Sequence, residues 1–408
     1  MELSDRNTVN YLMKILVLIH EFPPVGGGGG RVAKDIAAGL VKLGHQVRVI
    51  STHMQGLPYQ ENIDGVIVDR LPTKRKTAYR AEFFDMAHFN LSAIQRGRKI
   101  IQEWKPDVIH AHFAVPAGAV ALILSKLSGI PYVLTAHLGD VPGAVPEKTD
   151  KWFRWIYPFT PPIWKNANRV VAVSEFTRQM ALAHYSIAID VIPNGVELTS
   201  LPNSNVPTLT QVIDDDRVLK PAQLVTNDKT VRIVFAGRFM EQKNPEHLVD
   251  ALFQLSYLPW RCAMLGDGPL LDSIREKIEK SGLSDRFQLP GWMTPEQVIN
   301  EFSKSDVLVL PSRSEGLSVV GVQALAMGLA MILSDVGGNL ELVSETENGF
   351  LFPVGDVEML TKRLKHLLEN PEFLRSARAK SFEKAQKYDL QAIVSRYEEI
   401  FLKIESKK

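Results

Sequence analysis

Apolar residues along this chain gather in short, unbroken runs, with longer amphipathic segments between them. Residues 15–19 and 307–310 are such runs, and 47–50 and 231–236 are interrupted by a single arginine each; β-branched residues are frequent in all four. Unbroken runs of this length are typical of strands buried on both faces of a parallel sheet. The segments that follow them, such as 31–43, carry apolar residues at helical spacing. The alternation predicts an α/β fold with parallel sheets.

This alternation occurs in two series, 15–192 and 231 to about 388, which predict two doubly wound, Rossmann-like domains that face each other across a cleft. The stretch between them carries proline, asparagine and aspartate with little periodicity, and it is too long for an ordinary loop. We therefore expect an N-terminal domain at 1–197, a linker or insertion at 198–230, a C-terminal domain at 231–388 and a final helix at 389–408.

Composition and charge narrow the function classes. The chain has 408 residues and a formal net charge of +1, which gives no support for binding to nucleic acid. A single cysteine, Cys262, excludes internal disulfides and fits a reducing compartment. The apolar stretches stay shorter than the ~20 residues that cross a bilayer. We expect a cytoplasmic protein.

The strand at 307–310 ends in a tight turn, and Ser318 is placed to cap the helix that follows it. Free amides and the positive end of the helix dipole would then face an anionic ligand. Glu315 lies in the same turn, so the ligand should offer hydroxyl groups as well as phosphate, as a nucleotide sugar does. The residues expected at this anion site are Glu315, Gly316, Leu317 and Ser318.

A second loop of the same kind follows the strand at 231–236. It begins at Gly237 and carries two cations, Arg238 and Lys243, before the next helix. Arginine holds a diphosphate through two parallel hydrogen bonds, and lysine adds a point charge. Without a metal, such side chains must neutralise a leaving diphosphate. Gly266, at the end of the next strand, lies in a turn with room for a ligand.

Five glycines at 26–30 connect the first strand with the first helix, which we expect to begin near Arg31. A dinucleotide-binding fold would place an acidic residue at the end of the second strand, and residues 51–53 contain none. The glycine signal for a nicotinamide cofactor is therefore weak. A flexible surface turn is one alternative. The other is a close approach of the backbone to a ligand, which would involve Gly28, Gly29 and Gly30.

Two further strands of the first series end in histidines, His112 and His137. Ligands of open α/β sheets bind at the carboxyl ends of the strands, so both side chains should point toward one crevice. A zinc site needs three or four converging ligands, and no cysteine lies nearby. We therefore predict no metal site, regard His110 and His112 as structural, and retain His137 as a candidate ligand contact.

Residues 315–328, EGLSVVGVQALAMG, resemble the donor-binding signature of the retaining glycosyltransferases of family 4, also called group 1, which have the GT-B fold. SEFTRQM and VIPNGVEL in the first half resemble further landmarks of that family. The resemblance extends over nearly the whole chain from Lys14 onward. It implies that the last helix, near 390–404, crosses back to the first domain.

The resemblance also implies an activity. The enzyme would be a metal-independent hexosyltransferase in polysaccharide biosynthesis. It would move a hexose from a nucleoside diphosphate sugar, UDP-glucose by default, to a glycan or lipid-linked acceptor. The anomeric configuration would be retained, and no cofactor would be needed. In such enzymes the donor binds mainly to the C-terminal domain, and the leaving phosphate helps to deprotonate the acceptor.

The resemblance assigns roles to individual positions. Arg238 and Lys243 would stabilise the diphosphate, and Glu315 would orient the donor sugar through its hydroxyl groups. His137 would contact that sugar, and the backbone around Trp292 would meet the base.

One position departs from the family pattern. A second glutamate is expected after seven intervening residues, and Gln323 stands there. In relatives this glutamate bonds the ribose hydroxyls; glutamine keeps an acceptor oxygen, so the loss is about 1 kcal/mol. The departure leaves open a degenerate, non-catalytic nucleotide-sugar-binding module. A sugar-nucleotide epimerase with the same fold is a further alternative, and it would need acid and base carboxylates in the cleft.

Two segments of the first half bear on the acceptor. Residues 74–99 combine basic and apolar side chains, which indicates a solvated helix surface or, as the resemblance permits, peripheral contact with anionic lipid at the inner face of the plasma membrane. Residues 151–160 are rich in aromatic side chains. We predict that these pack in the core, with an acceptor or membrane contact as the alternative.

Overall fold

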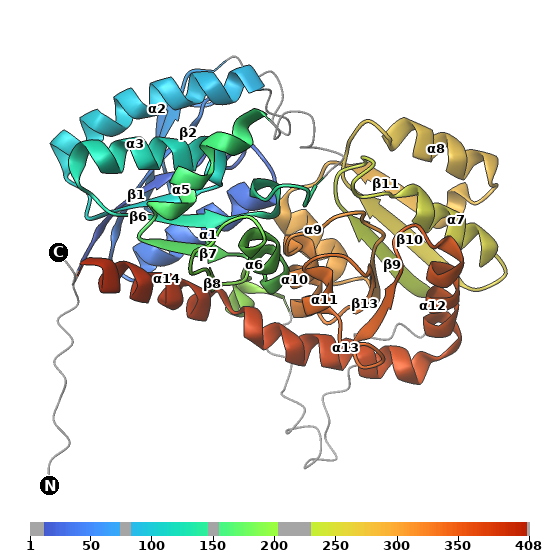
Figure 1. Cartoon of the computed structure of the whole chain (residues 1–408). Coiled ribbons are helices and arrows are strands. Elements are labelled where there is room, and N and C mark those ends of the chain that lie inside the picture. The colour runs from blue at the N-terminus through green and yellow to red at the C-terminus, as the bar shows by residue number, and fades with distance from the viewer. Residues whose placement is uncertain (1–11, 74–82, 146–154, 203–229, 406–408) are drawn as a thin grey trace, which may run out of the picture.

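The computed structural model describes residues 12–73, 83–145, 155–202 and 230–405. These residues form two α/β domains, each built on its own sheet, and helix α14 (Leu390–Glu405) lies against the first domain although it follows the second in the chain (Figure 1). The two Rossmann-like domains and the crossing helix predicted from the sequence are confirmed. The predicted boundaries at 197 and 388 stay predictions, and most of the predicted linker, 203–229, lies outside the described residues.

The first sheet has eight strands in the order β3-β4-β2-β1-β5-β6-β7-β8. Neighbouring strands are parallel except β3 and β4, which form an antiparallel hairpin at one edge. Its strands are β1 (Lys14–Leu18), β2 (Gln46–Thr52), β3 (Gln60–Ile63), β4 (Val66–Leu71), β5 (Val108–His112), β6 (Tyr132–Ala136), β7 (Arg169–Ala172) and β8 (Asp190–Val191).

The second sheet has six parallel strands in the order β11-β10-β9-β12-β13-β14. In each sheet the strand order reverses once, between β1 and β5 and between β9 and β12. Open α/β sheets bind ligands at such switch points, beyond the carboxyl ends of the strands. The strands are β9 (Val231–Ala236), β10 (Trp260–Leu265), β11 (Phe287–Gly291), β12 (Val307–Leu310), β13 (Ala330–Ser334) and β14 (Gly349–Phe352).

Helices cover both faces of each sheet (Figure 1). In the first domain α1 (Gly28–Lys42) and α14 cover one face, and α2 (Phe83–Trp104), α3 (Ala119–Ser128) and α5 (Pro161–Lys165) cover the other. A single large core fills the second domain. Its helices are α7 (Glu246–Gln254), α8 (Leu271–Lys280), α9 (Pro295–Phe302), α10 (Val319–Ala326), α11 (Asn339–Leu342), α12 (Val357–Glu369) and α13 (Pro371–Ala385).

The two domains are joined by backbone hydrogen bonds beside α14. The Val196 amide donates to the Tyr388 carbonyl at 2.9 Å, and the Leu390 amide donates to the Val196 carbonyl at 3.0 Å. Beyond this point α14 buries Tyr397 and Phe401 completely among side chains of the first domain. The last helix is therefore part of the N-terminal core.

Three local features differ from the sequence-based expectations. The edge hairpin of β3 and β4 was not predicted. Helix α1 begins inside the glycine run, at Gly28, three residues before the expected start. In the described part of 151–160, Trp155 and Phe159 are 77% and 74% exposed, so the predicted core packing of these two side chains is wrong.

Candidate active site

The loops after β9 and β12 meet at the switch point of the second sheet. Lys243 Nζ lies 2.5 Å from Glu315 Oε1, and the Ser312 hydroxyl donates to the same oxygen at 2.7 Å. Glu315 is only 6% exposed, and this buried carboxylate is neutralised by the half-buried Lys243 and accepts a further hydrogen bond from the Ser312 hydroxyl. The two charged residues chosen from separate motifs thus form one site.

Two hydrogen bonds hold these two loops together. The Arg313 amide donates to the Gln242 carbonyl at 2.8 Å, and the Gln242 side chain donates to the Ser314 carbonyl at 3.2 Å. Arg238 lies half buried on the first of these loops. The site is therefore preorganised by the protein.

Helix α10 begins directly after the second loop. The Ser318 hydroxyl accepts from the Gly321 amide at 3.2 Å, which confirms the predicted N-cap. The amides of Val319 and Val320 precede the capped one and have no partner within the helix, so they remain available to an anion. Gln323 lies half buried one turn further on, and its side chain forms no hydrogen bond with the described residues.

Gly237 and Gly266 were both predicted to contact the ligand, and their backbones pack against each other. A Cβ at Gly266, whose φ is +133°, would lie 2.0 Å from the Gly237 carbonyl oxygen. The Gly237 amide in turn donates to the Leu265 carbonyl at 2.9 Å. Close packing of the ends of β9 and β10 therefore explains Gly266 without a ligand. Trp292, in the loop after β11, is 68% exposed, and a contact with a base stays a prediction.

The glycine run of the first domain lies close to both domains. A Cβ at Gly28 would be 3.3 Å from Val319 Cγ2, across the cleft, and one at Gly29 would be 2.5 Å from Phe113 Cζ and 3.6 Å from His137 Cε1. A Cβ at Gly30 would be 2.6 Å from the Glu21 carbonyl oxygen. Gly28, Gly29 and Gly30 therefore form the first turn of α1, whereas Gly26 and Gly27 precede the helix.

His137 lies at the end of β6 beside the glycine run. Its ring stacks on Phe113, with centroids 4.3 Å apart, and its Nε2 lies 3.5 Å from His112 Nδ1. Burial disfavours the imidazolium and, with a contribution from His20, lowers the pKa of His137 to about 4. The side chain is thus a neutral imidazole at neutral pH. Phe113 has a φ of +71°, a strained conformation typical of functional sites.

Asp140 fixes the loop that carries His137. Its two carboxylate oxygens accept from the backbone amides of His137 and Ala114, each at 2.8 Å. Burial raises the pKa of Asp140 to about 7, against the lowering effect of these amides. Asp140 is a site residue that was not predicted, although its spacing from His137 is that of a capping pair.

The loop after β12 also contacts the first domain directly. The Asn194 side-chain amide donates to the Leu317 carbonyl at 2.8 Å, and a Cβ at Gly316 would lie 3.2 Å from Leu138 Cβ. The two halves of the predicted site are therefore in contact. Among the described residues no group of three or more histidine, cysteine, aspartate or glutamate side chains is arranged to hold a metal ion.

Of the basic segment at 74–99, residues 74–82 lie outside the described residues. In the remainder, Arg96 Nη2 pairs with Asp69 Oδ1 at 2.7 Å, and Lys99 pairs with Glu103 at 3.8 Å. These cations therefore have partners within the domain. No helix in the described part of the chain is long and apolar enough to span a membrane.

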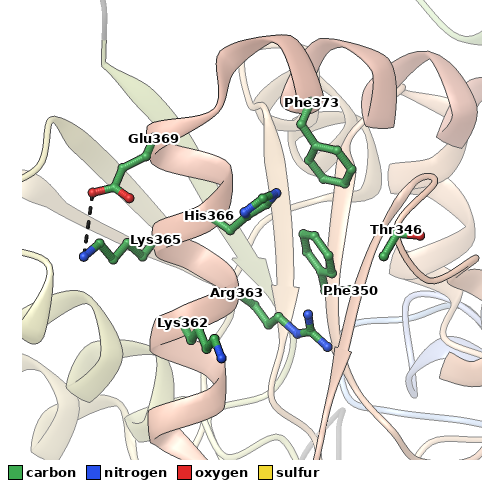
Figure 2. A pocket seen from close by; sticks show the side chains of 8 residues that line it. All are labelled: Thr346, Phe350, Lys362, Arg363, Lys365, His366, Glu369 and Phe373. Carbon is green, nitrogen blue, oxygen red and sulfur yellow. Dashed lines mark ion pairs between the residues drawn. The ribbon is translucent and has the colours of Figure 1, made fainter.

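A hollow of about 390 Å³ lies between α12, α13 and β14 (Figure 2). Phe350 and Phe373 stack in it with centroids 5.1 Å apart, and the Arg363 guanidinium lies over the Phe350 ring at 4.7 Å. None of the predicted site residues lines it. The hollow is therefore separate from the site at the switch point; its lining residues are Thr346, Phe350, Lys362, Arg363, Lys365, His366, Glu369 and Phe373.

Comparisons with known proteins agree with this architecture. The family model described as "Glycosyl transferases group 1" matches residues 216–387, and "Glycosyltransferase Family 4" matches residues 26–200. An uncharacterized glycosyltransferase of Methanocaldococcus jannaschii is 26% identical over 385 residues, which cover 94% of this chain and 96% of the relative.

Two further proteins are similar over much of their length. The UDP-Gal:alpha-D-GlcNAc-diphosphoundecaprenol alpha-1,3-galactosyltransferase of Escherichia coli is 26% identical over 67% of this chain and 69% of its own. The structure of sucrose-phosphate synthase from Thermosynechococcus elongatus aligns with a TM-score of 0.82 and 20% identity, covering 97% of this chain and 100% of that one. The two family matches, one for each domain, and the shared fold show that this chain belongs to the group 1 glycosyltransferases of the GT-B fold.

Proposed function

We propose that this glycosyltransferase moves a hexose from a UDP-sugar, UDP-glucose in the first instance, to a glycan or lipid-linked acceptor in polysaccharide biosynthesis. The transfer would retain the anomeric configuration and proceed without a metal ion or cofactor. The observation that carries the proposal is the contact of the half-buried Lys243 with the buried Glu315 at the switch point, between the loop that carries Arg238 and the loop that leads into α10.

The charges at this site suit a nucleoside diphosphate as the leaving group of the transfer. Arg238, Lys243 and the free amides of Val319 and Val320 would stabilise the negative charge that develops on the diphosphate. Glu315 would accept hydrogen bonds from sugar hydroxyls with its second oxygen, because Lys243 and Ser312 both contact Oε1. This arrangement holds the donor through both its charged and its neutral parts.

His137 would contact the sugar from the opposite domain as a neutral hydrogen-bonding group. Its low pKa of about 4 argues against a role as a cation. The leaving phosphate would help to take the proton from the acceptor hydroxyl, so no separate base is required.

UDP is the first choice of nucleotide because the similar Escherichia coli enzyme carries UDP-Gal in its name, together with a lipid-linked acceptor. Gln323 would accept one hydrogen bond from the ribose, where relatives use a carboxylate. A peripheral contact with the inner face of the plasma membrane, through the basic segment at 74–99, would bring such an acceptor within reach.

Hydrolysis of the donor tests the reaction without knowledge of the acceptor. The protein would be incubated with UDP-α-glucose in EDTA, and the released glucose followed by proton NMR before the anomers equilibrate. Early release of α-glucose together with UDP supports a retaining, metal-independent transferase. Early release of β-glucose contradicts retention, and activity that EDTA abolishes contradicts metal independence.

The same experiment separates the alternatives. A non-catalytic binding module would bind UDP-glucose and release nothing. An epimerase would convert the bound sugar nucleotide into its epimer, which gives a distinct NMR spectrum. Either result would overturn the proposed transfer.

A further inference from the structure

Helix α6 (Glu175–Leu182) of the first domain is capped by a residue of the second domain. The Ser174 hydroxyl accepts from the Thr177 amide at 3.0 Å, which leaves the first two amides of the helix without a local partner. Glu341 Oε1, from α11, accepts from the Glu175 amide at 2.8 Å and from the Phe176 amide at 3.4 Å. A carboxylate at the positive end of a helix is favourable, so this contact holds the two domains together.

The segment that carries Glu341 is packed directly against the loop between β12 and α10, residues 311–318, which we call the donor loop. A Cβ at Gly337 would lie 1.7 Å from the Glu315 carbonyl oxygen, and one at Gly338 would lie 1.7 Å from the Gly316 carbonyl oxygen. The Gly338 amide donates to the Glu315 carbonyl at 3.2 Å. With no room between the two segments, a displacement of Glu341 is passed on to the loop that presents Glu315.

Glu341 also contacts the connection between the two domains. The Tyr388 hydroxyl donates to the Glu341 carbonyl at 3.2 Å, and Tyr388 is the residue whose own carbonyl accepts from the Val196 amide. Glu341 thus contacts the first domain with its side chain and the interdomain connection with its carbonyl group. It is linked to the donor loop through Gly337 and Gly338, which directly precede α11.

From these three contacts we propose that Glu341 is a positioning residue, which holds the cleft closed and couples closure to the placement of the donor loop. Opening the cleft would return the carboxylate and the two amides of α6 to water, so the contact favours the closed form over the open one. The inference rests on the proposed glycosyl transfer for its effect on rate. Its effect on domain arrangement is independent of any substrate.

The test compares Glu341→Ala, Glu341→Gln and the control Glu347→Gln, an exposed glutamate in the same domain. Small-angle X-ray scattering of the ligand-free proteins reports domain arrangement, and donor hydrolysis at saturating UDP-glucose reports kcat. We expect Glu341→Ala to raise the radius of gyration and to lower kcat about tenfold. Glu341→Gln, which keeps an acceptor oxygen, should fall between the alanine variant and the wild type.

An alanine variant with an unchanged radius of gyration overturns the proposal, whether or not its rate falls. A glutamine variant no better than alanine also contradicts it, because an acceptor oxygen is then not what matters. If alanine prevents folding, the glutamine variant decides by the same two measurements. If the wild type hydrolyses no donor, the proposed function fails, while the scattering comparison still tests the closure contact.

Discussion

The contact between Lys243 and Glu315 decides how much charge the crevice presents to a donor. Because Glu315 is almost fully buried, removing its cation leaves a buried carboxylate whose remaining partner, among the residues that the structure describes, is the Ser312 hydroxyl. We expect Lys243→Ala to lower the free energy of unfolding by about 3 kcal/mol and the affinity for UDP at least tenfold. Chemical denaturation and calorimetric titration measure the two effects.

A double variant separates the structural from the binding role of Lys243. In Lys243→Ala combined with Glu315→Gln no uncompensated charge remains, so stability should recover in part while UDP affinity stays low. The control Lys365→Ala removes an exposed lysine that lies 3.8 Å from Glu369 on the surface, and it should change neither quantity. Full recovery of UDP affinity in the double variant would show that Lys243 does not bind the diphosphate.

His137 should remain neutral at pH values well below the usual pKa of histidine. Its folded-state pKa of about 4 lies below the ordinary value of 6.5, so the folded protein binds fewer protons than the unfolded chain between these values. Its contribution to stability is therefore complete above pH 6.5 and is lost as the pH falls toward 4. Imidazole nitrogen shifts in NMR, assigned with a His137→Asn variant, should show no titration of His137 between pH 8 and pH 5.5. Titration near pH 6.5 would contradict the burial of this ring.

At the residue scale the sequence predicts which side chains gather but not how they pair. Charged residues in strand-end loops mark Arg238, Lys243 and Glu315 because parallel strands place their carboxyl ends at one edge. The direct contact between Lys243 and Glu315 joins positions 72 residues apart, and no local pattern encodes it. The roles of Ser312 and Asn194 also depend on tertiary contacts, which the local sequence pattern does not predict.

At the scale of elements, close packing between two short loops explains why glycine stands at positions 337 and 338 near the site. Gly338 has a φ of −68°, so alanine is compatible with its backbone, and only the 1.7 Å approach to the Gly316 carbonyl excludes a side chain. We expect Gly338→Ala to cost about 1–3 kcal/mol and to weaken UDP binding by shifting the donor loop. Thermal unfolding and calorimetry would show both.

Gly139→Ala is the matched control for that change. A Cβ at Gly139 meets no atom within 4 Å, and its φ lies outside the left-handed region, so stability should change by less than about 0.5 kcal/mol. Equal effects of the two substitutions would show that backbone entropy, and not the contact under the donor loop, determines the cost at Gly338.

The unbroken apolar runs predict the strands well, because buried parallel strands have no exposed face to interrupt them. β12 begins and ends where the sequence predicts. The missed hairpin of β3 and β4 is an exposed edge, yet its turn carries Asp64 and Gly65, both with positive φ, and Asp-Gly is a known hairpin signal. The aromatic residues Trp155 and Phe159 could not be placed, since burial of such side chains depends on neighbours that are distant in sequence.

At the scale of the whole molecule, α14 makes the first domain depend on the end of the chain. Phe401 is fully buried, and its ring centroid lies 5.3 Å from that of His110 on β5. Phe401→Ala should lower the free energy of unfolding by about 3–5 kcal/mol, whereas Glu399→Ala, on the exposed side of the same helix, should change little. Denaturant unfolding measures the difference; similar small effects of both would mean that α14 is not part of this core.

The loops after β9 and β12 should bind a nucleoside diphosphate. The most direct measurement is calorimetric titration of the purified protein with UDP, GDP and ADP, repeated on Arg238→Ala and on the surface control Arg275→Ala. We predict micromolar binding of one diphosphate, with UDP expected, which is lost in Arg238→Ala and retained in Arg275→Ala. Absence of binding by all three diphosphates, or equal binding by Arg238→Ala, would contradict the assignment of the donor site.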